Sequence, residues 1–78
     1  MHYVYLIKLC NGDYYQGETV DLRRRIEEHR KGWNKSTSRY LPIRLICYLA
    51  FVDRAKAREF ERYLKTGSGY AFRNKHLV

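Results

Sequence analysis

Hydrophobic residues at the start of the chain follow the pattern of a β-hairpin. Residues 3–9 are apolar or aromatic apart from Lys8, and they lead into the pair Asn11-Gly12. An Asn-Gly pair is the strongest short hairpin signal, because both residues tolerate positive φ. The sequence therefore predicts a strand over residues 3–9 and an antiparallel partner strand over residues 13–17.

After the hairpin, the period of the apolar residues changes from that of a strand to that of a helix. The apolar residues at helical spacing are Leu22, Ile26 and Trp33. Thr19 or Asp21 is placed to cap the start of this helix, and Gly32 is placed to end it. We expect a first helix over residues 21–31.

The middle of the chain contains a polar segment followed by a strongly apolar one. Residues 34–42 carry serine, threonine, lysine and arginine without periodicity, which is typical of a basic surface loop. Residues 43–52 contain isoleucine, leucine, tyrosine, phenylalanine and valine with little polarity, and this composition suits the best-buried strand of a sheet.

Residues 53–65 have the pattern of a second helix. Asp53 is placed to cap it, an apolar stripe follows, and Gly67 and Gly69 are placed to end it. The stripe consists of Ala57, Phe60 and Leu64. A short third helix is expected over residues 70–76. The order of elements predicts an α+β fold in a single domain over residues 1–78, with a small three-stranded sheet covered by two to three helices.

The composition of the chain bears on the size of its core and on the class of partner that it attracts. The chain is 45% hydrophobic, so 78 residues can build one modest core, and its 16 Lys and Arg against 8 Asp and Glu give a net charge of +8. Such a charge attracts polyanions, which makes nucleic acid the first partner to consider. The charge alone is equally compatible with a role in solubility or with attraction to a membrane surface.

The sequence gives no indication of an export signal, a membrane span, a zinc site or a disulfide. The first residues show no basic leader with a long apolar run, and no apolar stretch is long enough to span a bilayer, so we expect a cytoplasmic, nucleoid-associated protein. Cys10 and Cys47 stand alone in apolar runs, so we expect two reduced, packed cysteines. Neither has metal-ligand spacing, and a disulfide would be unexpected in the cytosol.

Two polar residues of the first helix fall beside its apolar face. At about 100° per residue, Arg25 and His29 lie within about 60° of Leu22. An arginine and a histidine four residues apart present guanidinium donors and an imidazole to the same point, which would suit a phosphate. The same pattern would also arise from a snorkelling arginine and a hydrogen-bonded core histidine.

Glu61 on the second helix likewise allows a functional and a structural interpretation. It lies beside Phe60 at the edge of the apolar stripe, where a carboxylate is costly unless a cation meets it. The cation is either an arginine or a divalent metal. Mg²⁺ keeps several waters and shares its other positions with phosphate oxygens, so one protein ligand is sufficient in a nuclease.

The eight tyrosines include two pairs on the predicted hairpin. The pairs are Tyr3 with Tyr5 and Tyr14 with Tyr15. Aromatic residues favour sheets, so most of the tyrosines have a structural role. Gly17 lies one residue beyond Gln16 at the end of the second strand, and a glycine there lets another backbone or a ligand approach closely.

Taken in order along nearly the whole chain, these residues resemble the GIY-YIG nuclease superfamily, in particular its small stand-alone members. The resemblance rests on Val4-Tyr5, Tyr15-Gln16-Gly17, Arg25, His29 and Glu61. It implies a central three-stranded antiparallel sheet in the order β-β-α-β-α-α. Tyr3 stands where the motif has glycine, and Gln16 stands where it has isoleucine. Several relatives have a basic residue near the position of Glu18, and a carboxylate there would raise the pKa of a neighbouring tyrosine.

The resemblance also implies catalytic roles. Tyr5 and Tyr15 match the motif tyrosines, one of which positions or deprotonates the attacking water, and Arg25 would bind the scissile phosphate. His29 matches a position that is His or Tyr in relatives. Glu61 matches the ligand of a divalent metal, Mg²⁺ or Mn²⁺, and Asn74 is the nearest counterpart of a terminal polar residue.

The resulting hypothesis is a metal-dependent endonuclease that hydrolyses phosphodiester bonds of DNA, with RNA as a second candidate substrate. A domain this small favours structure-selective or weakly sequence-selective cutting, in repair, recombination or mobile-element processing. A homodimer or a larger partner would add selectivity. The residues expected to bind nucleic acid are Arg24, Lys35, Ser36, Thr37 and Arg39.

Two alternatives remain. A non-catalytic nucleic-acid-binding module of the same fold would keep the basic loop and bind in a salt-dependent way. A protein-interaction adaptor would use exposed tyrosines, but it would leave Arg25 and Glu61 unexplained.

Overall fold

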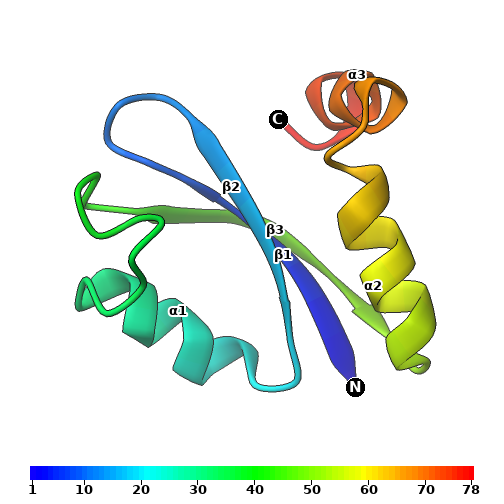
Figure 1. The fold of residues 1–78 in the computed structure, drawn as a ribbon, viewed down its shortest axis with the longest axis horizontal. Coiled ribbons are helices and arrows are strands. Elements are labelled where there is room, and N and C mark those ends of the chain that lie inside the picture. Colours follow the sequence, from blue (N-terminus) through cyan, green and yellow to red (C-terminus); the bar gives the residue numbers. More distant parts are fainter.

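The computed structural model describes residues 1–78 and contains three strands and three helices (Figure 1). Their order is β-β-α-β-α-α, which confirms the predicted α+β fold. The elements are β1 (His2–Lys8), β2 (Tyr14–Thr19), α1 (Leu22–Arg30), β3 (Arg44–Phe51), α2 (Arg54–Tyr63) and α3 (Gly67–His76).

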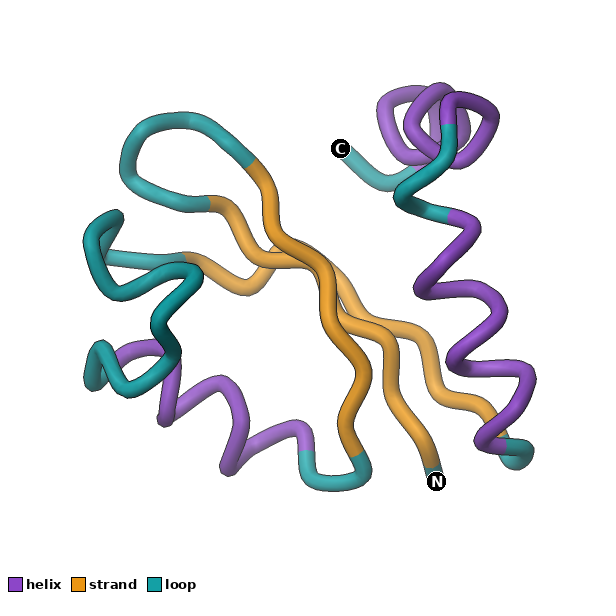
Figure 2. Tube along the Cα trace, in the orientation of Figure 1, coloured by secondary structure: helices purple, strands orange, loops and turns teal.

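The three strands form one antiparallel sheet in the order β2-β1-β3 (Figure 2). Successive side chains of β1 alternate between its faces. Tyr5 and Ile7 belong to a core cluster with Ile26 of α1, whereas Val4 belongs to a second cluster with Ala57 and Leu64 of the α2 end. The helices therefore cover opposite faces, with α1 on one and α2 with α3 on the other.

The expectation that residues 43–52 form the best-buried strand is wrong. The centre of the sheet is β1, in which Val4, Tyr5, Leu6 and Ile7 are at most 1% exposed. Strand β3 pairs on one side only, and none of its residues is fully buried. An edge strand in so small a sheet is incompletely covered by helices, so its apolar composition does not translate into burial.

The hairpin turn is longer than the two-residue Asn-Gly turn that the pattern suggests. Leu9 N–H donates to Asp13 O at 2.8 Å and Gly12 N–H donates to Leu9 O at 3.0 Å. Asn11 keeps negative φ, and only Gly12 has positive φ, at +91°. This is the arrangement of a three-residue loop with glycine in the left-handed position, and β2 begins after it at Tyr14.

Side chains cap all three helices at their starts. Asp21 accepts a hydrogen bond from Arg24 N–H, and Asp53 accepts one from Ala55 N–H, as the sequence predicts. The third helix begins three residues earlier than expected, because Thr66 Oγ1 accepts from Gly69 N–H at 3.1 Å. Gly67 and Gly69 therefore lie inside α3 and do not end α2.

Two expected core residues lie at the surface. Trp33 is 68% exposed, because α1 ends at Arg30 and the chain turns away, and Lys31 Nζ lies 4.9 Å from the centre of its ring. Cys10 is exposed and Cys47 is half-buried, and both are free thiols.

No helix has both the length and the apolar character needed to cross a bilayer.

Candidate active site

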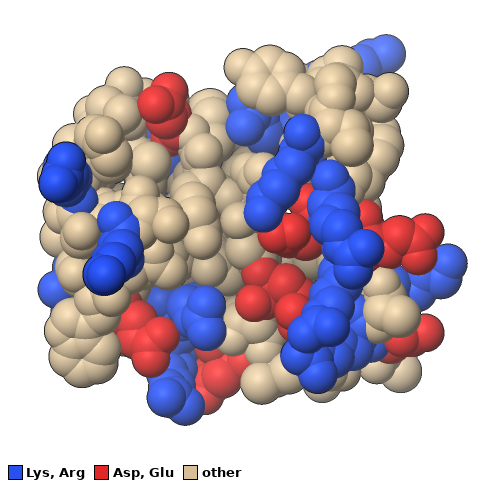
Figure 3. All heavy atoms as spheres, in the orientation of Figure 1, with Lys and Arg blue, Asp and Glu red and all other residues tan.

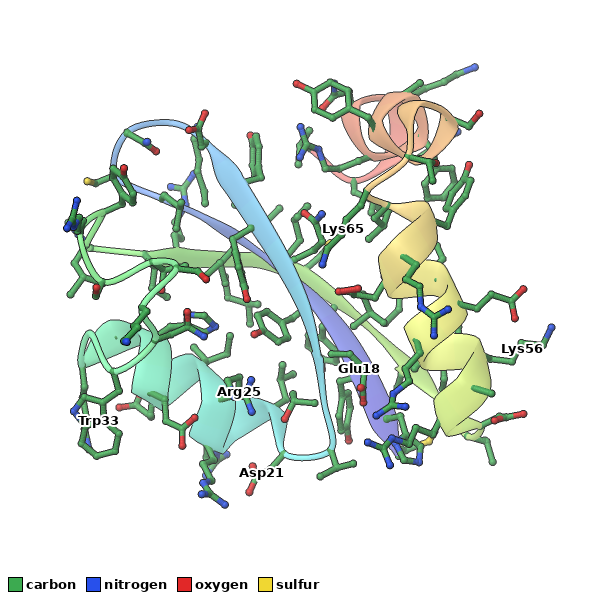
Figure 4. All side chains as sticks on the ribbon, in the orientation of Figure 1. Glu18, Asp21, Arg25, Trp33, Lys56 and Lys65 are labelled. Carbon is green, nitrogen blue, oxygen red and sulfur yellow. The ribbon has the colours of Figure 1, made fainter.

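A polar pocket of about 350 Å³ opens along β2 at the edge of the sheet. Figure 4 shows Arg25 on one side of β2, with Glu18 and Lys65 on the other. Both helix layers therefore contribute to the pocket. Its lining consists of Tyr5, Tyr15, Gln16, Gly17, Glu18, Arg25, Arg58, Glu61 and Arg62.

Four of the five residues expected to be catalytic line this pocket. They are Tyr5, Tyr15, Arg25 and Glu61. A larger groove of about 480 Å³ runs beside α1, but it is lined by none of these residues. We place the candidate site in the smaller pocket because it gathers phenols, a guanidinium and carboxylates from four elements, which is the donor set that chemistry on a phosphate requires.

Tyr5 reaches the pocket across the backbone of β2. It pairs directly with Gly17 in the hairpin register. A Cβ at residue 17 would overlap the Tyr5 hydroxyl oxygen and would lie 2.6 Å from Tyr5 Cζ. A close approach at Gly17 is present, but the approaching group is the side-chain ring of Tyr5 and not another backbone segment or a ligand.

Behind the pocket, Tyr5 begins a buried chain of hydrogen bonds. Its hydroxyl lies 2.8 Å from His29 Nε2, and His29 Nδ1 lies 2.8 Å from Thr37 Oγ1. Tyr5 is 1% exposed, and His29 and Thr37 are 0% exposed. The ring of Tyr15 packs against the His29 imidazole edge-on, with 5.4 Å between ring centres. The His29 imidazole is therefore restrained by Tyr5, Thr37 and Tyr15.

Burial is the largest cause that lowers the pKa of His29, and the nearby Arg25 lowers this pKa further, against a weaker opposite effect of Glu28. The imidazole is therefore neutral at neutral pH. A neutral imidazole has one donating and one accepting nitrogen, so it relays hydrogen bonding between Tyr5 and Thr37.

Burial also raises the pKa of Tyr5 to about 12, and Tyr15 and Glu61 raise this pKa as well, whereas Arg25 lowers it. Glu18, which the sequence suggests as a disturbing charge near the tyrosines, is not among the causes. Tyr5 is thus a protonated phenol at neutral pH, and its proton has a neutral acceptor within hydrogen-bond distance.

Arg25 is held by a partner on its own helix. Its Nε lies 3.2 Å from Glu28 Oε1, and Glu28 also pairs with Arg24. The Arg25 side chain remains 40% exposed at the pocket, so it is both positioned and accessible. This is the arrangement expected of a guanidinium that binds an incoming phosphate.

Glu61 pairs with a lysine four residues further along the chain. Lys65 Nζ lies 2.8 Å from Glu61 Oε1, and the Glu61 side chain is 16% exposed. The ion-pair partner of Glu61 in this structure is therefore a lysine, Lys65, and not the arginine that the sequence offered as the alternative to a metal. The second carboxylate of the pocket, Glu18, lies 3.7 Å from Arg58 Nε and 4.0 Å from His2 Nδ1.

A single divalent cation fits the donor set of the pocket. Glu61 supplies hard carboxylate oxygens at an open polar pocket, and Mg²⁺ needs few protein ligands because it keeps waters and binds substrate oxygens. The chain contains no group of three or more His, Cys, Asp or Glu that would enclose a metal.

The residues expected to bind nucleic acid lie outside the pocket. Lys35, Ser36 and Arg39 lie on the segment after α1, and Arg24 is exposed on α1 itself. The expectation that Thr37 lies on the surface is wrong. A turn around Asn34, whose backbone carbonyl accepts from Thr37 N–H at 3.2 Å, directs Thr37 inward to His29.

Sequence reasoning missed three residues of the pocket wall and gave Asn74 an uncertain role. Arg58 and Arg62 stand four residues apart on α2, and this spacing is visible in the sequence, while Glu18 is noticeable there only as a departure from relatives. The side chain of Asn74 accepts hydrogen bonds from Arg73, and Asn74 does not line the pocket.

Comparisons with known proteins find a family model and several relatives that match most of the chain. The family model described as the GIY-YIG catalytic domain matches residues 1–75. A UPF0213 protein of Halalkalibacterium halodurans is 37% identical over 65 residues, which cover 82% of this chain and 69% of that protein. A UPF0213 protein of Halobacterium salinarum is 36% identical over 66 residues, which cover 83% of this chain and 86% of that protein.

A solved structure has the same fold. The solution NMR structure of the UPF0213 protein BH0048 from Bacillus halodurans aligns with a TM-score of 0.57 at 33% sequence identity. The alignment covers 90% of this chain and 78% of the other.

Replacing Gly17 by alanine tests whether Tyr5 needs the space above β2. Gly17→Ala should lower the free energy of unfolding by about 1–3 kcal/mol, because the new methyl group overlaps the Tyr5 ring. Urea unfolding followed by circular dichroism measures this loss. Gly67→Ala is the matched control, since a Cβ there meets no atom within 4 Å. Equal effects of the two substitutions would contradict the packing argument.

His29 should make stability depend on pH. The pKa of His29 in the folded state is lower than its ordinary value of 6.5, so below that pH the unfolded chain takes up a proton that the folded chain does not. The free energy of unfolding should therefore fall as the pH is lowered from about 7.5 to about 5.5, before most carboxylates titrate.

Urea unfolding of His29→Gln and of the exposed-site control His76→Gln checks this expectation. The dependence should be weaker in the first variant and unchanged in the second. NMR titration of the three histidines in the unmodified chain gives an independent measurement. A normal pKa for His29 would refute the neutral, buried imidazole.

Proposed function

Because this chain belongs to the GIY-YIG catalytic domain family, a family of nucleases, we propose that it is a divalent-metal-dependent endonuclease that hydrolyses phosphodiester bonds of DNA. One observation supports this most strongly. Tyr5, Tyr15, Arg25 and Glu61 come from four elements and line one polar pocket, with His29 hydrogen-bonded directly behind it. We also propose structure-selective or weakly sequence-selective cutting.

Arg25 is the residue proposed to bind the scissile phosphate. Its guanidinium would donate hydrogen bonds to the non-bridging oxygens and stabilise the charge that develops on them. The Glu28 contact at 3.2 Å holds the side chain beforehand, so little ordering is needed when the substrate arrives.

Tyr5 is the proposed general base, acting together with His29. A water proton would pass to the Tyr5 oxygen while the Tyr5 proton passes to His29 Nε2, at the observed separation of 2.8 Å. His29 would then be an imidazolium, with the Tyr5 proton on Nε2 and its own Nδ1–H donating to Thr37 Oγ1, while the water proton stays on Tyr5. The raised pKa of Tyr5 explains why a free phenolate is not the resting form of the base. Tyr15, whose ring packs against the same His29 imidazole, would help to position the water.

Glu61 is the residue that would hold the divalent ion, Mg²⁺ or Mn²⁺, through its carboxylate oxygens. When bound, such an ion would offset negative charge on the phosphate and assist departure of the leaving oxygen. Lys65 would release Glu61 on binding of the ion, and its ammonium group would then be free to meet a neighbouring phosphate.

Cleavage assays with variants of Glu61 and Arg25 test the proposal. Supercoiled plasmid, branched DNA and RNA are incubated with Mg²⁺, Mn²⁺ or EDTA. Glu61→Gln and Arg25→Gln should each lower the cleavage rate by a factor on the order of 10² or more, as loss of a group that stabilises transition-state charge does. Glu27→Gln removes a carboxylate outside the pocket and should retain activity.

Cleavage that survives both pocket substitutions would refute the site assignment. Absence of cleavage with every metal and substrate, together with salt-sensitive binding in EDTA, would instead favour a non-catalytic nucleic-acid-binding module.

A further inference from the structure

Helix α2 presents three arginines on one exposed face. Arg54, Arg58 and Arg62 follow each other at intervals of four residues, so they stand above one another along the helix. Figure 3 shows Lys and Arg side chains gathered in a band over α2. We call Arg54, Arg58 and Arg62 the arginine stripe.

The arginine stripe begins in the wall of the candidate active site. Arg58 and Arg62 line the pocket that contains Tyr5 and Glu61. With Arg54, the same two arginines line an adjoining hollow of about 480 Å³ on the outer side of the helix. The stripe therefore runs without interruption from the pocket to this hollow, whose lining contains one carboxylate, that of Glu59.

Folding does not explain the arginine stripe. The buried contacts of α2 are made by Ala57, with Phe60 packed beside it, on the other side of the helix. Of the three arginines, only Arg58 has an ion-pair partner, Glu18 at 3.7 Å. Like charges at four-residue spacing repel each other on a helix, and Arg54 and Arg62 have no carboxylate within 4 Å that would offset this repulsion.

The phosphodiester backbone of a nucleic acid strand matches this surface in charge and length. Arg54 and Arg62 are eight residues apart, a rise of about 12 Å. Phosphates of one strand rise about 3.4 Å per nucleotide along the duplex axis, so the stripe faces about three to four nucleotides. Guanidinium groups bind phosphate oxygens in a fork geometry that suits such a track.

We propose that the arginine stripe of α2 binds the phosphates that flank the scissile one, and that it is the principal nucleic-acid contact of this chain. The flanking position rests on the proposed function. Contacts of this kind orient the strand without reading its sequence, which fits weakly selective cutting. The segment after α1, with Lys35 and Arg39, lies outside the pocket and is a secondary contact.

The salt dependence of binding tests this proposal directly. Fluorescence anisotropy with labelled duplex DNA, in EDTA across a KCl series, compares the unmodified chain with two triple variants of equal charge. The stripe variant carries Arg54→Gln, Arg58→Gln and Arg62→Gln, and the loop variant carries Lys31→Gln, Lys35→Gln and Arg39→Gln. Circular dichroism verifies that each variant is folded.

The slope of log K against log salt should become shallower by about 2 to 3 in the stripe variant, since each lost phosphate contact contributes about 0.9. The loop variant should change by less than about 1. A loop variant that loses as much slope as the stripe variant, or a stripe variant with an unchanged slope, would overturn the proposal. The same series with duplex RNA shows whether the surface distinguishes the two polymers.

Cleavage measured beside binding separates this proposal from the proposed function. Cleavage by the unmodified chain with no effect of the stripe substitutions on binding would refute the stripe and leave the endonuclease standing. Stripe-dependent binding without cleavage in any metal would refute the endonuclease and support the stripe as a binding surface. Absence of any binding by the unmodified chain would refute both.

Discussion

The position of the Tyr5 side chain is the constraint on which the candidate site depends. Tyr5 belongs to the central strand, and its ring fills the space that a Cβ on Gly17 would occupy. From there its hydroxyl meets His29 of α1, and His29 in turn meets Thr37. One glycine therefore allows a core tyrosine to connect the sheet, the first helix and the following segment, and to face the pocket at the same time. Each of these groups is buried and hydrogen-bonded, so the loss of one leaves another unsatisfied.

The sheet topology explains why the site is open although its central tyrosine is buried. Helices α1 and α2 cover opposite faces of the sheet, so Arg25 and Glu61 can meet only by reaching around an edge. Strand β2 is that edge, and its residues 15–18 form the floor of the pocket. The central strand supplies rigidity, and the edge supplies access for a strand of nucleic acid. A sheet of three strands is small enough for one pocket to draw on both helix layers.

The sequence predicted the order of the elements and most of the residues that gather at the pocket, because these depend on local spacing. Helical periodicity placed Arg25 and His29 beside Leu22, and the structure brings them to the pocket and to the core behind it. Strand burial, in contrast, depends on which strand becomes central, and composition alone does not determine this. Thr37 was misplaced for a similar reason, since an irregular segment has no period from which the direction of a side chain can be inferred. The arginine stripe was visible as spacing, but only the pocket beside it gives that spacing a role.

The pattern of ion pairs explains how Arg25 and Glu61 avoid each other before substrate binds. They line the same pocket and carry opposite charges. Each instead pairs locally, Arg25 with Glu28 at three residues and Glu61 with Lys65 at four. Such local pairs are weak at a partly exposed surface, so a phosphate or a divalent ion can replace them at small cost. Each helix therefore supplies a local partner, Glu28 for Arg25 and Lys65 for Glu61. A substrate phosphate and its cation can replace these partners on binding.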